Sequence, residues 1–120
     1  MENDILGIAL ENYYQNHKDI PIIIHSPDFD DDQILPSWYF RNFDEMPDIE
    51  KYALEKCKTK ILDVGAGAGS HALYLQNLGK EVSALDISKG ACSVMRKRGL
   101  KKIIQKNVFE LKSEQFDTIL

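Results

Sequence analysis

The stretch Lys60-Ile-Leu-Asp-Val-Gly-Ala-Gly-Ala-Gly-Ser70 decides how this chain folds. It begins with a short, mostly apolar run that is typical of a buried strand. Glycines at alternate positions then predict a turn, and a helix is predicted to follow over residues 70–78, ended by Gly79. A glycine-rich turn between a strand and a helix brings backbone N–H groups close to a ligand, because no side chain blocks the approach.

Strands and helices alternate from this turn onward. Strands are predicted over residues 60–64, 81–85, 101–105 and 116–120, and helices over 70–78 and 88–98. Such alternation is typical of parallel βαβ units in a sheet that helices cover on both faces. The expected fold class is therefore α/β, a Rossmann-like doubly wound parallel sheet.

The first half of the chain shows a different pattern. Its predicted segments are a helix over 3–16, an edge strand or extended chain over 20–24, a loop over 25–33 and a helix over 48–57. An aromatic patch with Arg41 inside it lies between the loop and the second helix. We therefore expect an N-terminal helical and irregular accessory segment, residues 1–58, followed by a βαβ core, residues 59–120.

Polar residues stand where the predicted strands end. Asp63 precedes the first glycine by two residues, a place that is usually apolar in dinucleotide-binding turns, and Ser70 replaces the third glycine of that fingerprint. Asp86 ends the next strand, where a carboxylate can accept both hydroxyls of a ribose. Asn107 and Val108 follow the third strand, where a polar side chain and a backbone amide can read an adenine edge.

On these residues the chain resembles the class I S-adenosylmethionine (SAM)-dependent methyltransferases. Residues 63–69 match the first motif of that family, Asp86 matches the second, and residues 116–120 resemble the strand before the catalytic loop. The resemblance covers about residues 60–120, half of the chain. It implies a seven-stranded sheet, SAM as the cofactor, S-adenosylhomocysteine (SAH) as the product, and methyl transfer to an O, N, C or S nucleophile.

The resemblance also implies a set of cofactor contacts. The residues implied are Asp63, Gly65, Ala66, Gly67, Gly69, Asp86, Ile87, Asn107 and Val108. Asp63 would hold the amino group of SAM, the glycine turn would pass under the methionine and ribose, and Asp86 would bind the ribose. Ile87 would pack on the adenine face, while Asn107 and Val108 would bind the adenine edge. Asn107 stands where many members have Asp, but an amide oxygen still accepts a hydrogen bond.

The sequence names no catalytic residue, because no His, Cys or Lys has a spacing that identifies a general base. Ser70 fits a helix cap. His71 fits either an exposed polar position or a contact with the SAM carboxylate or a substrate. Arg41 and its aromatic neighbours either pack the N-terminal helices or grip the SAM carboxylate or an acidic acceptor.

Composition limits the partners. The net charge of −4 and pI of about 5.3 argue against a large basic surface for nucleic acid and favour a small-molecule acceptor. Two distant cysteines fit a reducing cytoplasm, and no apolar run approaches the length of a membrane span. Asp28, Asp30 and Asp32 fit the start of a calcium loop, but Gln33 stands where glycine is needed. No metal site is predicted.

The sequence ends inside the fourth predicted strand. We therefore expect the N-terminal portion of a longer enzyme, with a sheet incomplete at its C-terminus and little activity in this portion alone. The alternative is a short protein that completes its sheet with another copy. An apolar strand edge predicts a homodimer or domain swap through that edge, or an irregularly packed chain end.

Two further functions stay open at this point. One is a non-catalytic methyltransferase-like module for dimerisation or nucleotide sensing. The other is an NAD(P)-binding oxidoreductase, although Asp63 and Ser70 count against it.

Overall fold

The computed structural model describes residues 4–111 and 116–120. In chain order its helices, strands and short 3-10 helices (η) are α1 (Ile5–Asn16), β1 (Ile22–Ser26), β2 (Phe29–Ile34), η1 (Pro36–Phe40), η2 (Phe43–Glu45), α2 (Asp48–Lys56), β3 (Lys60–Val64), α3 (Ser70–Asn77), β4 (Glu81–Leu85), α4 (Lys89–Lys97), β5 (Ile103–Ile104), η3 (Val108–Glu110) and β6 (Thr118–Ile119). The predicted α/β class and the alternation of strands and helices after residue 59 are confirmed.

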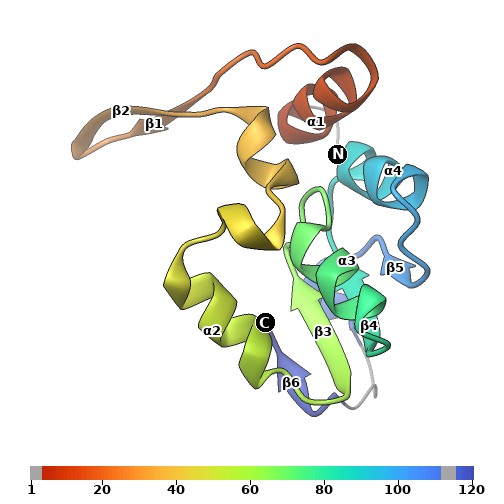
Figure 1. Cartoon of the computed structure of the whole chain (residues 1–120). Coiled ribbons are helices and arrows are strands. Elements are labelled where there is room, and N and C mark those ends of the chain that lie inside the picture. The colour runs from red at the N-terminus through yellow and green to blue at the C-terminus, as the bar shows by residue number, and fades with distance from the viewer. Residues whose placement is uncertain (1–3, 112–115) are drawn as a thin grey trace.

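The larger sheet has four parallel strands in the order β5-β4-β3-β6. The chain leaves β3 for β4 on one side and later returns to β6 on the other (Figure 1). The carboxyl end of β3 is therefore the point at which the strand order reverses. Open α/β sheets bind their ligands at such a switch point, and here it holds the glycine turn.

Two clusters of buried side chains hold these elements together. The larger joins α2, α3, α4 and the sheet and contains Met46, Leu54, Cys57, Ile61, Ala72, Leu75, Val82, Ala84, Cys92, Met95 and Leu100. The smaller contains Leu10, Ala68, Ala91 and Val94, with Leu6, Tyr39 and Phe40 packed against it. The N-terminal half thus contributes side chains to both clusters.

Helix α1 packs beside α4 (Figure 1), and one carboxylate joins the two helices. Asp4 caps α1 by accepting the Gly7 N–H at 3.0 Å, and it also accepts the Ser88 hydroxyl at 2.7 Å and the Gly90 N–H at 2.8 Å. Burial raises the pKa of Asp4, but these hydrogen bonds outweigh burial and lower it. Asn3, where the helix was predicted to begin, lies outside the described residues. The division at residue 58 stays a prediction.

The predicted loop over residues 25–33 is wrong. Strands β1 and β2 form an antiparallel hairpin that extends away from the rest of the molecule (Figure 1). Aspartate disfavours strands chiefly where a side chain must pack, but Asp30, Asp31 and Asp32 are all exposed here. His25 also pairs with Asp31 across the hairpin at 2.8 Å. The accessory segment is therefore helical, irregular and partly β.

The outer strands of the sheet are shorter than predicted. The structure has two-residue strands at Ile103–Ile104 and Thr118–Ile119, although Lys102, Asp117 and Leu120 beside them also form backbone hydrogen bonds with β4 or β3. Among the described residues, no helix is long and apolar enough to cross a membrane.

Candidate cofactor-binding site

The glycine turn leaves open space beside the end of β3. Gly65 has a φ of +66°, which favours glycine, and a Cβ at this position would meet no heavy atom within 4 Å. A side chain is excluded at Gly69 by close packing, since a Cβ there would lie 2.8 Å from the Met95 side chain. Gly65 therefore faces free space while Gly69 allows α3 and α4 to pack closely. Free space next to exposed backbone is what a bound ligand requires.

Asp86 lies at the end of β4 and is only 8% exposed. One carboxylate oxygen accepts the Gly67 N–H at 2.9 Å, and the other accepts the Ser88 N–H at 2.9 Å. The side chain thus fixes the glycine turn to the loop that begins α4. Each carboxylate oxygen has a second acceptor position, so a ribose hydroxyl can still bind.

Asp63 lies at the end of β3 and is only 4% exposed. Among the described residues, no hydrogen bond contributes to the pKa of this carboxyl. Burial, together with the negative charge of Asp86, raises the pKa of Asp63 to about 6, against the opposing effect of His71. A buried carboxylate without a partner is costly, and a cationic ligand group would relieve that cost.

Two cavities flank the turn and share Val64 and Gly65 as lining residues. The first, of about 300 Å³, is lined by Asp63 together with Trp38, Tyr39, Arg41, Ala66, Ser70, His71 and Leu120. The second, of about 210 Å³, is lined by Leu85, Asp86, Ile87, Lys106, Asn107 and Val108. The residues expected to bind the two ends of the cofactor therefore lie in two cavities that meet at the glycine turn.

The Asn107 side chain is engaged locally. Its oxygen Oδ1 accepts the Phe109 N–H at 3.1 Å, while the backbone N–H of Asn107 donates to the Glu110 side chain at 3.0 Å, and the two bonds together cap η3. The side chain still lines the smaller cavity beside Ile87 and Val108. Its contact with adenine stays a prediction.

The N-terminal half covers the turn through η1. The Tyr39 ring lies against Gly67, where a Cβ would be 3.0 Å from the ring. Ser70 donates its hydroxyl to the Tyr39 carbonyl at 2.6 Å, and Arg98 donates to Ser70 at 3.2 Å. The expected capping role of Ser70 is wrong, because the helix cap is Gly69 and the Ser70 hydroxyl fastens η1 to α3.

Three charged or polar side chains form a connected group at the 300 Å³ cavity that Asp63 lines, called the Asp63 cavity below. Arg41 binds Glu50 through two hydrogen bonds of 2.9 and 3.1 Å, and His71 Nε2 lies 2.8 Å from Glu50 Oε1. The Arg41 guanidinium also lies 4.0 Å from the centre of the Trp38 ring. Burial raises the pKa of Glu50, but the hydrogen bonds from Arg41 and His71 outweigh burial and lower it.

Sequence reasoning did not find Glu50. It lies in the first turn of α2, where an acidic residue is ordinary, so its pattern alone signals nothing. Its partners are 9 and 21 residues away in the chain, and only the folded structure brings them together.

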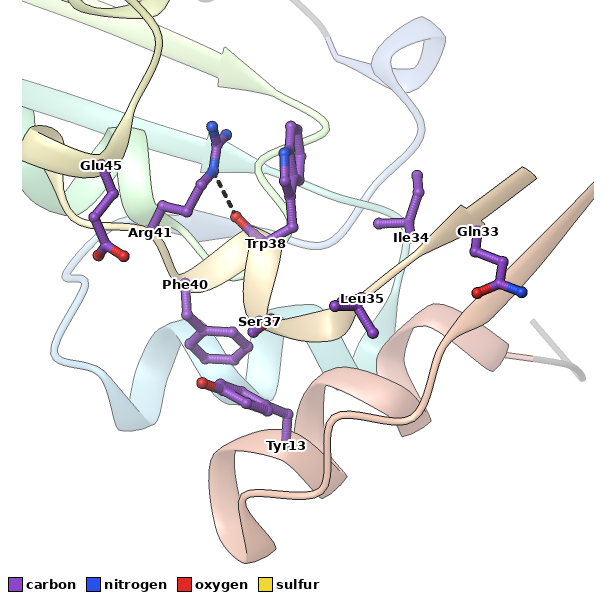
Figure 2. Close-up of a pocket in the computed structure, with 9 residues that line it drawn as sticks. All are labelled: Tyr13, Gln33, Ile34, Leu35, Ser37, Trp38, Phe40, Arg41 and Glu45. Carbon is purple, nitrogen blue, oxygen red and sulfur yellow. Dashed lines mark hydrogen bonds between the residues drawn. The ribbon is translucent and has the colours of Figure 1, made fainter.

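A third cavity, of about 720 Å³, lies in the N-terminal half (Figure 2). Its lining residues are Tyr13, Gln33, Ile34, Leu35, Ser37, Trp38, Phe40, Arg41 and Glu45. Trp38 and Arg41 also line the Asp63 cavity, so the two cavities share these side chains as a wall. Arg41 Nε donates to the Trp38 carbonyl at 2.8 Å, which holds that wall together.

Comparisons with known proteins agree with this fold and site. A family model described as a methyltransferase domain matches residues 62–120. A solved SAM-dependent methyltransferase from Bacteroides fragilis, in complex with SAH, is 44% identical with a TM-score of 0.91, over 98% of this chain and 49% of that chain. The chain thus spans about half the length of that protein. A search of curated protein sequences gives no match.

Two more distant structures share the fold alone. The tRNA (uracil-54, C5)-methyltransferase of Pyrococcus abyssi is 22% identical, with a TM-score of 0.53 over 82% of this chain and 27% of that chain. The plantazolicin methyltransferase BpumL is 19% identical, with a TM-score of 0.51 over 98% of this chain and 46% of that chain.

The parallel sheet, the glycine turn at its switch point and the two strand-end carboxylates define a Rossmann-like cofactor-binding domain. With the family match and the Bacteroides fragilis structure, they establish that the chain belongs to the class I SAM-dependent methyltransferases.

Proposed function

We propose that this chain is the cofactor-binding part of a SAM-dependent methyltransferase that acts on a small-molecule acceptor. SAM is the methyl donor and SAH is the product. The observation that carries this proposal is the buried Asp63 carboxylate, whose pKa no hydrogen bond from a described residue lowers, in a cavity beside an open glycine turn. The cationic amino group of an amino acid is the kind of group that such a site favours.

The two cavities beside Gly65 suit the two ends of SAM. Asp63 binds the amino group in the larger one, and Gly65, Ala66, Gly67 and Gly69 form the floor between them. Asp86 binds the ribose at the entrance to the smaller one. The residues proposed around the adenine are Ile87, Asn107 and Val108.

SAM, when bound, supplies an electrophilic methyl group. The residues of this chain bind it, orient it and shield it from water. Trp38 and Tyr39 form part of the wall of the Asp63 cavity, and the Ser70 hydroxyl holds Tyr39 in place through its carbonyl. The aromatic faces in that wall also suit a sulfonium cation.

The 720 Å³ cavity of Figure 2 is the proposed acceptor site. It shares Trp38 and Arg41 with the Asp63 cavity, so an acceptor there would lie next to the cofactor. Its volume and its aromatic lining fit a small molecule. The negative net charge of the chain favours such an acceptor over nucleic acid. We also propose a cytoplasmic location.

Calorimetric titration with SAH tests the proposal. The chain should bind SAH, and Asp63→Asn should weaken binding about tenfold to a hundredfold, because a charge-assisted hydrogen bond is lost. Asp28→Asn, an exposed change of the same kind in the hairpin turn, should leave binding unchanged. NAD⁺ should not compete. Equal SAH binding by Asp63→Asn and the native chain would contradict the proposed site.

We further propose that the chain forms a homodimer through β6. Among residues 4–111 and 116–120, this strand pairs with β3 alone, and Ile119 in it is 71% exposed. An edge of this kind favours pairing with another strand. Light scattering should give the mass of a dimer, and a monodisperse monomer would count against the proposal.

A further inference from the structure

His71 is the second residue of α3 and lines the same cavity as Asp63. Its Nε2 lies 2.8 Å from Glu50 Oε1. An ionised carboxylate only accepts hydrogen bonds, so Nε2 carries a proton. No described residue forms a hydrogen bond with the second ring nitrogen, Nδ1, so a ligand can approach it, and a protonated ring donates from it.

Arg41 holds Glu50 in place, and Glu50 in turn orients His71. Its two hydrogen bonds to Glu50 are the bidentate kind, which hold both partners in one orientation. The positive charge of Arg41 also neutralises the negative charge of Glu50. A protonated His71 therefore leaves the three side chains with one net positive charge at the wall of the cavity, facing the negative Asp63.

The start of α3 adds to this positive character. Its cap residue, Gly69, offers no side chain to the free N–H groups of the first turn. By contrast, the start of α4 is capped by Ser88 and also by Asp4. A helix start without a side-chain cap favours an anion. The start of α3 lies at the Asp63 cavity, because Ser70 and His71 line that cavity.

We propose that His71 binds the α-carboxylate of the amino-acid end of the cofactor while Asp63 binds its amino group. The inference rests on the proposed function, since it assumes SAM or SAH in this cavity. Both groups of an amino acid sit on one carbon atom, so their partners must lie close together. Asp63 and His71 meet this condition, because they line one cavity and the charge of His71 acts on the Asp63 carboxyl. Glu50 and Arg41 are then positioning residues.

The test compares ligands that differ at one group. The full chain is titrated with SAH, with the decarboxylated analogue of SAH, which keeps the amine, and with 5′-methylthioadenosine, which lacks both groups. His71→Gln should weaken SAH binding about tenfold and leave the other two ligands within twofold. Asp63→Asn should weaken both SAH and the decarboxylated analogue. Neither variant should change binding of 5′-methylthioadenosine.

His25→Gln is the matched control, since it breaks a His–Asp pair of the same 2.8 Å length in the exposed hairpin. It should leave all three affinities unchanged. Glu50→Gln serves as a second variant if His71→Gln unfolds, and it should weaken SAH more than the decarboxylated analogue. In ¹⁵N spectra, the His71 Nδ1 resonance should move on addition of SAH but not of the analogue.

The possible outcomes separate this inference from the proposed function. Equal weakening of SAH and its decarboxylated analogue by His71→Gln would overturn the inference, because it would show a structural role. Unchanged SAH binding would also overturn it. Failure of the native chain to bind SAH at all would instead contradict the proposed function.

Discussion

Asp63 and Asp86 both lie near the carboxyl ends of neighbouring strands, yet their surroundings differ. Asp86 accepts hydrogen bonds from the backbone N–H groups of Gly67 and Ser88. No hydrogen bond from a described residue contributes to the pKa of Asp63, and burial raises that pKa to about 6. One carboxylate shapes the glycine turn, and the other is left for a ligand.

The difference shows how folding and binding can make opposite demands on one residue type. Asp86 gains its partners on folding and should stabilise the native state. Asp63 loses water on folding, and the attraction of His71 offsets only part of this cost, so Asp63 should destabilise the native state until a cation arrives. Each of the following changes breaks or sharpens this contrast.

Asp63→Asn should have the largest effect. The rise of the pKa from 3.8 to about 6 corresponds to about 3 kcal/mol of destabilisation at neutral pH. Because the pKa of Asp63 is higher in the folded chain than in the unfolded chain, the native chain has its full stability below pH 3.8. It loses about this much stability as the pH rises through about 6. Denaturant unfolding should therefore show that the variant gains stability over the native chain across this range and keeps the gain at pH 7.

The control for this gain is Asp28→Asn, which should follow the native curve because Asp28 is exposed. A variant that loses stability at pH 7, or a difference that does not depend on pH, would mean that Asp63 is stabilised within the protein.

Asp86→Ala should act in the opposite direction. It leaves the N–H groups of Gly67 and Ser88 without their acceptor, at a cost of about 2 kcal/mol. Thermal unfolding should show a lower melting temperature, while Asp30→Ala in the exposed strand β2 should show little change. An Asp86→Ala protein as stable as the native chain would remove the contrast between the two carboxylates.

Gly65→Ala should have the smallest effect on stability and separates strain from binding. Gly65 and Gly79 both have a positive φ and open space around the missing Cβ, so alanine should cost about 1 kcal/mol at either position. Only Gly65 lines the two cavities beside the turn. Calorimetry should show weaker SAH binding for Gly65→Ala and unchanged binding for Gly79→Ala. Equal affinities would place the ligand away from the turn.

The features that could be predicted from the sequence are those that depend on residues close together in the chain. The strand and helix bounds near the turn, the Asp63 and Asp86 positions and the family follow from residues within a few positions of the glycines. The β1–β2 hairpin was missed because its aspartates disfavour strands, and only exposure of the whole hairpin makes them tolerable.

The remaining features depend on contacts between distant segments. Gly90 lies against Gly7, where a Cβ would come within 2.5 Å of the Gly7 backbone, and this allows α1 and α4 to pack. The link from Glu50 to His71 joins two helices in the same way. Neither glycine stands in a turn and neither polar residue has a special spacing, so a single sequence holds no signal for these contacts.

The central claim is that burial holds the pKa of Asp63 high, with no hydrogen bond from a described residue to lower it, until the amino group of the cofactor binds. Carboxyl ¹³C shifts, followed during pH titration of the native chain, measure its pKa directly with and without SAH. The account predicts a pKa near 6 in the free chain and a fall of at least about one unit with SAH, as expected when a cation approaches a carboxylate. An ordinary pKa in the free chain, or one that SAH leaves unchanged, would contradict it.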